Sequence, residues 1–235
     1  MSRYWPVALV TAAACCFALA PSASAKWYGS TMRGTPNADY GCETALTHGG
    51  LGGIVRSPTN QRSCTYSHNG YIFRQRPTFL VPATGRIRGI RIKSGPNPPR
   101  ARLTVLTSSS RVDTTTGQDI PGTYTCCTAR YVSRPFRLKP NGITRRRVNV
   151  RVFNVRSNDI NIRIHSSDGL ALSFGSGGRL PLKIIPSQLG SFATGTPLLR
   201  GFWPRTGRGD PRVDGYQLSG IDLMFQWDFR RARRR

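Results

Sequence analysis

Hydrophobic and polar residues alternate in two neighbouring segments of the chain, residues 147–155 and residues 160–165. The apolar positions are Val148, Val150, Val152, Ile160, Ile162 and Ile164. Successive side chains of a β-strand point to opposite faces, so each segment is predicted to be a half-buried strand. The turn-forming residues Ser157, Asn158 and Asp159 lie between them. They predict that the two strands pair as an antiparallel hairpin with one apolar face.

Shorter alternating segments predict further strands. The strongest pattern lies in residues 217–230, where apolar residues occupy every second position from Ile221 to Phe229. In residues 86–93 the isoleucines change phase across Gly89, as they do at a β-bulge. Other strand candidates are residues 71–73, 78–81, 103–105, 170–174, 182–185 and 198–203. No sustained helical period occurs, so we expect an all-β fold: a two-sheet antiparallel β-sandwich, jelly-roll-like, with an irregular disulfide-pinned N-terminal arm.

Composition suggests how this fold is bounded. Residues 26–70 are rich in Gly, Thr, Ser and Asn with little alternation, which predicts the irregular arm. The β-sandwich domain is expected at residues 71–229, with a long polar loop at residues 107–122. Residues 230–235 are five arginines and one alanine, and we expect a solvated basic tail.

The first 25 residues have the pattern of a secretory signal peptide. Arg3 precedes an uncharged apolar stretch from Trp5 to Leu19, and Ala23-Ser24-Ala25 offers small residues for cleavage. A spanning helix needs about 20 apolar residues, so no transmembrane segment is expected after cleavage. The expected location is secreted, either extracellular or associated with the cell wall.

The remaining cysteines, Cys42, Cys64, Cys126 and Cys127, predict two disulfides in an oxidising compartment. Three pairings are open, and we favour Cys42–Cys64 with a vicinal Cys126–Cys127 bridge, because adjacent side chains of a strand point to opposite faces. The three histidines are scattered and acidic residues are few, so neither a metal site nor a cofactor is expected.

The charge of the chain indicates the kind of partner. The chain has 35 Lys and Arg against 10 Asp and Glu, a net charge of +25. Such a surface attracts polyanions and also keeps a protein soluble. Zinc-finger spacing, a helix-turn-helix pattern and a ribonucleoprotein-type aromatic motif are missing from the sequence, so no specific nucleic acid is expected.

The predicted hairpin supplies a candidate ligand-binding face opposite its apolar one. That face comprises Arg145, Arg147, Asn149, Arg151, Asn161, Arg163 and His165. Arginine binds phosphate or carboxylate with two parallel hydrogen bonds, and asparagine can bind neutral hydroxyls. The alternative is an ordinary solvated sheet face.

These features predict an exported, non-catalytic protein of the cell envelope or extracellular matrix that binds an anionic cell-wall or extracellular polymer. Three other interpretations stay open: a neutral-carbohydrate-binding module, a secreted hydrolase and a purely structural envelope protein. The module would use the aromatic residues Trp27, Tyr28, Trp203 and Tyr216. The hydrolase would need a site assembled in space, because no sequence motif nominates catalytic residues. The sequence specifies no oligomeric state.

Several of these features together resemble a group of proteins. They are the small-residue signal end, the Thr125-Cys126-Cys127-Thr128 vicinal pair, the arginine-rich valine segment and the late Leu/Phe strand. The chain resembles uncharacterised exported β-sandwich proteins of high-GC actinobacteria that carry a vicinal Cys-Cys motif. The resemblance implies export and a β-sandwich, and it transfers no activity and no functional residue.

Overall fold

A computed structural model describes much of the chain. The described residues are 26–48, 54–58, 61–71, 80–113, 125–158, 162–189, 197–202, 205, 207–208 and 216–232. In this part of the chain the fold is all-β and every strand pairing is antiparallel, which confirms the predicted fold class. One 3-10 turn, η1 (Pro186–Gln188), follows a short strand. No helix among the described residues has the length and apolar character needed to cross a membrane.

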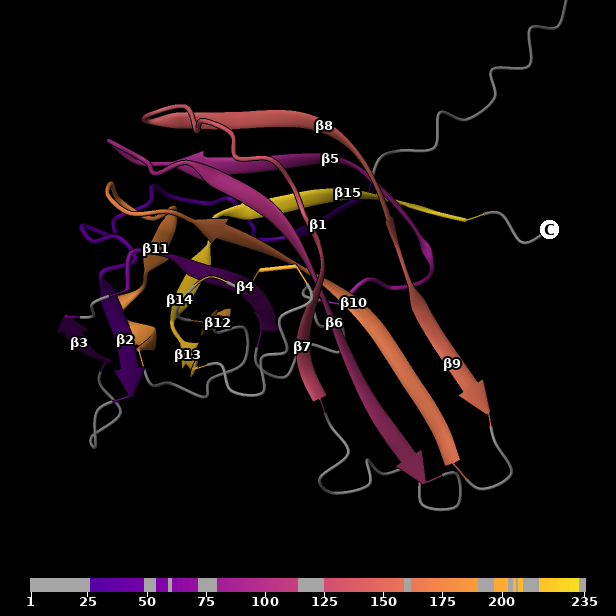
Figure 1. Cartoon of the computed structure of the whole chain (residues 1–235). Coiled ribbons are helices and arrows are strands. Elements are labelled where there is room, and N and C mark those ends of the chain that lie inside the picture. The colour runs from indigo at the N-terminus through magenta and orange to yellow at the C-terminus, as the bar shows by residue number, and fades with distance from the viewer. Residues whose placement is uncertain are drawn as a thin grey trace, which may run out of the picture.

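One layer of the fold is a four-stranded sheet, the upper layer in Figure 1. Its order is β1 (Lys26–Gly29), β15 (Phe225–Arg231), β5 (Gly85–Ser94), β8 (Gly142–Val152). Apolar residues alternate with arginines on β5 and β8, so that one face of this sheet is apolar and the other basic.

A larger sheet crosses below the first (Figure 1). Within the described residues it has seven strands. Its order is β13 (Tyr216–Ser219), β12 (Pro197–Phe202), β4 (Cys64–Tyr71), β10 (Ile162–Phe174), β6 (Ala101–Asp113), β7 (Thr125–Val132), with β9 (Asn154–Asn158) also paired to β10. Two small pairs complete the described strands: β11 (Leu182–Ile184) with β14 (Ile221–Leu223), and β2 (Thr44–His48) with β3 (Ile54–Pro58).

The main core lies between the two larger sheets. One cluster of buried side chains takes Ile87, Ile90 and Trp227 from the four-stranded sheet and Leu172 and Phe174 from β10 of the larger one. Burial of both apolar faces against each other is the arrangement of a β-sandwich. The sandwich packing therefore agrees with the sequence pattern, and the jelly-roll connectivity stays a prediction.

The predicted pairing of residues 147–155 with residues 160–165 was wrong. β8 pairs with β5, and the chain leaves the four-stranded sheet at Phe153. The Phe153 backbone N–H donates to the carboxylate of Asp168 on β10 at 2.7 Å, which fixes this crossing. The hairpin that does form is β9 with β10, in the larger sheet. Ser157 and Asn158, expected in the turn, are paired residues of β9, and residues 159–161 lie outside the described residues.

The predicted boundaries also change. Residues 30–43 contain no strand or helix, as expected of the arm, but the range 26–70 that was expected to be irregular also contains β1, β2, β3 and most of β4. Of these, β1 and β4 are strands of the two larger sheets, so residues before 71 belong to the sandwich. At the other end β15 extends to Arg231, so the expected basic tail begins later than residue 230. The expected polar loop also begins later, because β6 extends to Asp113.

The predicted strand at residues 217–230 is three strands, β13, β14 and β15. Gly220 separates the first two with a φ of 78°, a left-handed conformation that favours glycine. The polar residue Asp222, expected on an exposed face, is buried in β14. By contrast, the bulge expected at Gly89 is confirmed, because the register of β5 shifts between Ile87 and Gly89 against both neighbouring strands.

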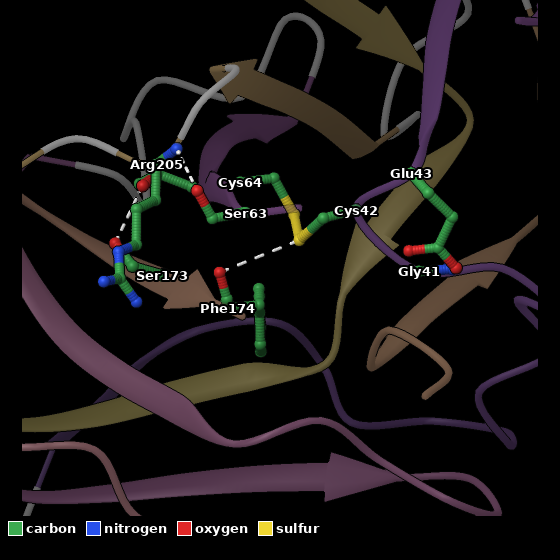
Figure 2. Close-up of a disulfide and its surroundings, with 9 residues drawn as sticks. Gly41, Cys42, Glu43, Ser63, Cys64, Ser173, Phe174 and Arg205 are labelled. Carbon is green, nitrogen blue, oxygen red and sulfur yellow. Dashed lines mark hydrogen bonds between the residues drawn. A yellow bond between two sulfur atoms is a disulfide. The ribbon is translucent and has the colours of Figure 1, made fainter. Parts of the chain in front are cut away.

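The predicted Cys42–Cys64 disulfide is confirmed (Figure 2). Both cysteines are buried, and the Cys42 sulfur lies 3.8 Å from the backbone oxygen of Phe174 at the end of β10. The bridge therefore ties the irregular segment to the middle of the larger sheet. Cys127 is also disulfide-bonded. The predicted partner Cys126 has a side chain outside the described residues.

Candidate functional site

The outer face of the four-stranded sheet gathers arginines from three strands. On β8 the valines at positions 148, 150 and 152 turn inward and the residues between them are exposed, as the alternation predicted. The residues of β5 and β15 beside them continue the basic surface. We call this surface the arginine face; its arginines are Arg86, Arg88, Arg91, Arg145, Arg147, Arg151 and Arg230.

Strand register brings these side chains into rows across the sheet. One row runs Arg230, Arg86, Arg151, and each member pairs with the next. A second row runs Trp27, Asp228, Gly89, Arg147, one residue from each strand. Neighbouring strands lie about 4.8 Å apart, so residues of one row form one continuous surface.

Two hollows lie side by side on the arginine face. The larger is a groove of about 780 Å³ whose lining includes six arginines and Asn149. Those arginines are Arg86, Arg88, Arg147, Arg151, Arg230 and Arg231. The smaller is a depression of about 490 Å³ whose lining includes Trp27, Gly89 and Asp228. Arg88 and Arg147 line both hollows. Every charged residue that lines the groove is an arginine, whereas the depression is lined by arginines and by the carboxylate of Asp228. A ligand that spans both hollows therefore meets these two environments one after the other.

No described acidic side chain forms an ion pair with the arginines of this face. Among the described residues, Arg130 forms an ion pair with Asp168 and His68 lies beside Asp222, and neither contact uses a side chain of the arginine face. Arg86 donates a hydrogen bond of 2.8 Å to the Asn149 side chain, which holds its guanidinium over β8. Positive charges gathered this closely with one carboxylate among them create a strongly positive local potential.

The structure unites part of the predicted ligand-binding set. Arg145, Arg147, Asn149 and Arg151 share the outer face of β8. Arg163 and His165 lie on β10 of the other sheet, so the expectation of one shared face was wrong for them. Their side chains and the whole of Asn161 lie outside the described residues.

Sequence reasoning missed the other half of the arginine face. Arg86, Arg88 and Arg91 alternate with inward isoleucines, and this pattern was visible in the sequence. The proximity of Trp27, Asp228 and Arg230 depends on β1 and β15 pairing from opposite ends of the chain. Of the aromatic candidates, Tyr28 is half-buried and packs against Trp227 and Phe229 of the core, so its ring is directed away from the arginine face.

Two polar clusters are built around buried carboxylates, and the first borders the arginine face, because Arg130 also donates a hydrogen bond of 2.6 Å to the backbone oxygen of Arg151. The Asp168 carboxylate accepts hydrogen bonds from Arg130 and Thr107, both at 2.6 Å, beside the Phe153 contact. The Nε2 atom of His68 lies 3.0 Å from one Asp222 oxygen, and Ser30 donates to the other at 2.7 Å. Ser30, His68 and Asp222 are all buried, so this cluster joins strands and presents no group to a substrate. The described residues contain no group of three metal-ligating side chains.

No protein-family model, curated protein or solved structure matches the chain. The structure itself describes the protein as an antiparallel β-sandwich with an internal disulfide and one strongly basic sheet face. The resemblance to exported actinobacterial proteins stays a prediction.

Proposed function

We propose that this is an exported, non-catalytic protein of the cell envelope or extracellular matrix that binds an anionic polymer through its arginine face. The observation that supports this most is the combination of seven arginines from β5, β8 and β15 with two adjoining hollows. Guanidinium groups bind phosphate and carboxylate with paired hydrogen bonds. An extended array of them suits a chain of anions better than one small molecule.

Export is supported by the buried Cys42–Cys64 disulfide, which suits an oxidising compartment. The strand β1 (Lys26–Gly29) lies after the predicted cleavage site and would stay in the mature protein.

A neutral-carbohydrate module is the second candidate, because Trp27 lies on the same face as the arginines. The two candidates differ in their response to salt. Binding through released counterions falls steeply as salt increases, whereas stacking on an aromatic ring does not. A hydrolase would release product, and a purely structural protein would bind neither kind of polymer.

The test is co-sedimentation of the secreted protein with isolated cell walls over about 50 to 200 mM salt. We expect retention at low salt that is lost at high salt. Reversing three charges on β8, Arg145→Glu, Arg147→Glu and Arg151→Glu, should weaken retention and reduce the salt slope by about one for each lost contact.

The matched control reverses three exposed arginines elsewhere, Arg100→Glu, Arg179→Glu and Arg205→Glu. Arg100 and Arg205 line a separate small hollow, so this control also tests a competing basic site. Both variants have the same net charge. Equal losses in the two variants would show that net charge alone drives retention, and a greater loss in the control would move the site off the arginine face. Retention that resists salt would favour the neutral-carbohydrate module.

A further inference from the structure

We propose that the depression around Gly89 binds one sugar ring of an acidic polysaccharide, whose charged groups bind the arginines around it. This inference rests on the proposed function and names the class of polymer. It starts from the row Trp27, Asp228, Gly89, Arg147, which crosses all four strands of the sheet.

Gly89 leaves the middle of this row without a side chain. A Cβ atom built there would lie 3.5 Å from Cη2 of Trp27 and 3.8 Å from Cβ of Asp228, both ordinary contact distances. The glycine is therefore not required by crowding or by a left-handed backbone. Because Gly89 has no side chain, the edge of the Trp27 indole can lie against the backbone of β5, and the indole borders the depression together with Asp228 and the arginines of β5 and β8.

Trp27 supplies an apolar wall of fixed orientation. Its ring is half-buried, and the guanidinium of Arg91 lies 3.8 Å from the ring centroid. Stacking by arginine limits the motion of the ring and places a positive charge beside the depression. An apolar wall next to positive charge suits a ligand that has both a ring and an anion.

Asp228 is the feature that distinguishes a sugar from a bare chain of phosphates. No hydrogen bond or ion pair joins its half-buried carboxylate to another described residue, although arginines surround it. Carboxylate oxygens accept hydrogen bonds, and sugar hydroxyls donate them. Towards a polyphosphate or a nucleic-acid backbone the same carboxylate is repulsive. A sugar ring that carries hydroxyls, in a polymer that also carries anionic groups, can bind Trp27, Asp228 and the surrounding arginines together.

The neighbouring groove takes the adjoining anionic sugars. It shares Arg88 and Arg147 with the depression, and the arginines of its lining come from β5, β8 and β15. A neutral glycan would leave these charges unused. The chemistry of the two hollows together therefore selects an acidic polysaccharide.

The experiment measures affinities of the secreted protein for polygalacturonate, long-chain inorganic polyphosphate and single-stranded DNA at one salt concentration. The quantity of interest is the ratio of the polygalacturonate affinity to the polyphosphate affinity. Trp27→Ala should lower this ratio about tenfold, the loss of one aromatic contact. Asp228→Asn should also lower it, because repulsion of phosphate is relieved while the charged acceptor for sugar hydroxyls is replaced by a weaker, neutral amide oxygen. Gly89→Ala should lower it while Trp27 and all charges stay in place.

Thermal unfolding of each variant verifies that the sheet is intact; Gly89→Ala is the variant expected to fold normally, because its new methyl group makes only ordinary contacts. An unchanged ratio in all three variants would overturn the inference while leaving the proposed function standing. A larger loss of DNA affinity than of polygalacturonate affinity in Trp27→Ala would assign the depression to a nucleobase and also overturn it. If the unmodified protein binds none of the three polymers at about 50 mM salt, the proposed function itself fails.

Discussion

Arg91 lies over the indole ring of Trp27 with its guanidinium carbon 3.8 Å from the ring centroid. Trp27 belongs to β1 and Arg91 to β5, and β15 lies between these two strands. The stack therefore bridges a strand on the outer face of the four-stranded sheet. It gives the basic face one fixed aromatic element and helps to hold the N-terminal strand in place.

We expect Arg91→Lys to lower the free energy of unfolding by about 0.5–1 kcal/mol, because lysine keeps the charge but loses the planar stack. Urea unfolding followed by circular dichroism measures the change. Arg145→Lys on the exposed part of β8 is the control and should stay within about 0.5 kcal/mol of the unmodified protein. Equal losses in the two variants would mean that the stack contributes nothing to stability.

A second prediction concerns Asp168, which fixes the point where the chain crosses between sheets. Its buried carboxylate accepts hydrogen bonds from Arg130, Thr107 and the Phe153 backbone. Asp168→Asn weakens these hydrogen bonds, but the Arg130 side chain is 37% exposed and water can solvate its charge, so we expect a loss of about 1–3 kcal/mol in the free energy of unfolding. Asp228→Asn makes the same chemical change at a carboxylate that no described residue binds and should have little effect on stability. Similar losses of unfolding free energy in Asp168→Asn and Asp228→Asn would contradict the stabilising role of the Asp168 hydrogen bonds.

The sequence predicted the faces of strands better than their partners, and β8 shows why. Alternation records whether a side chain is buried, so Val150 and Arg151 were placed on the correct faces. It does not record which strand lies alongside. The crossing at Phe153 depends on a hydrogen bond to Asp168, fifteen residues later in the chain, and no local pattern encodes that contact.

The segment ending at residue 230 shows a second limit. By alternation Asp222 is an outward polar residue, but it is buried, where it meets His68 of β4 and Ser30, which follows β1. Contacts with these two polar side chains offset the cost of burying the Asp222 carboxylate, which the alternation predicted to be exposed. The position of Trp27 and Asp228 beside the arginines was missed for a related reason, because these two residues become neighbours only when β1 and β15 pair.

The disulfide between Cys42 and Cys64 yields the third prediction. These residues are 22 positions apart, and a loop of this length corresponds to about 3 kcal/mol in the chain-entropy model. We expect Cys42→Ser with Cys64→Ser to lower the free energy of unfolding by that order. Urea unfolding with and without reductant measures it. Because reductant also reduces the disulfide of Cys127, the effect of the Cys42–Cys64 bridge is the difference between the two proteins under oxidising conditions, and this difference should shrink in reductant. Equal stability of the two proteins under oxidising conditions would refute the stabilising role.

The last prediction concerns Tyr66, a fully buried residue of β4. Burial raises the pKa of its phenol well above the ordinary value of 10.0, and the neighbouring Tyr40 raises it further. The unfolded chain therefore releases this proton at lower pH than the folded protein does. Below pH 10 both states hold the proton and stability is unaffected. Above it, the free energy of unfolding should fall by about 1.4 kcal/mol for each pH unit until the folded pKa is reached.

Tyr66→Phe removes the ionisable group and should flatten this part of the stability profile between about pH 10 and pH 11. Urea unfolding at successive pH values gives the slope for each protein. Tyr131→Phe is the matched control, because Tyr131 is 36% exposed and its phenol meets water in the folded state. Titration of lysines is common to all three proteins and cancels in the comparison. A slope in Tyr66→Phe as steep as in the unmodified protein would show that the alkaline loss of stability originates elsewhere.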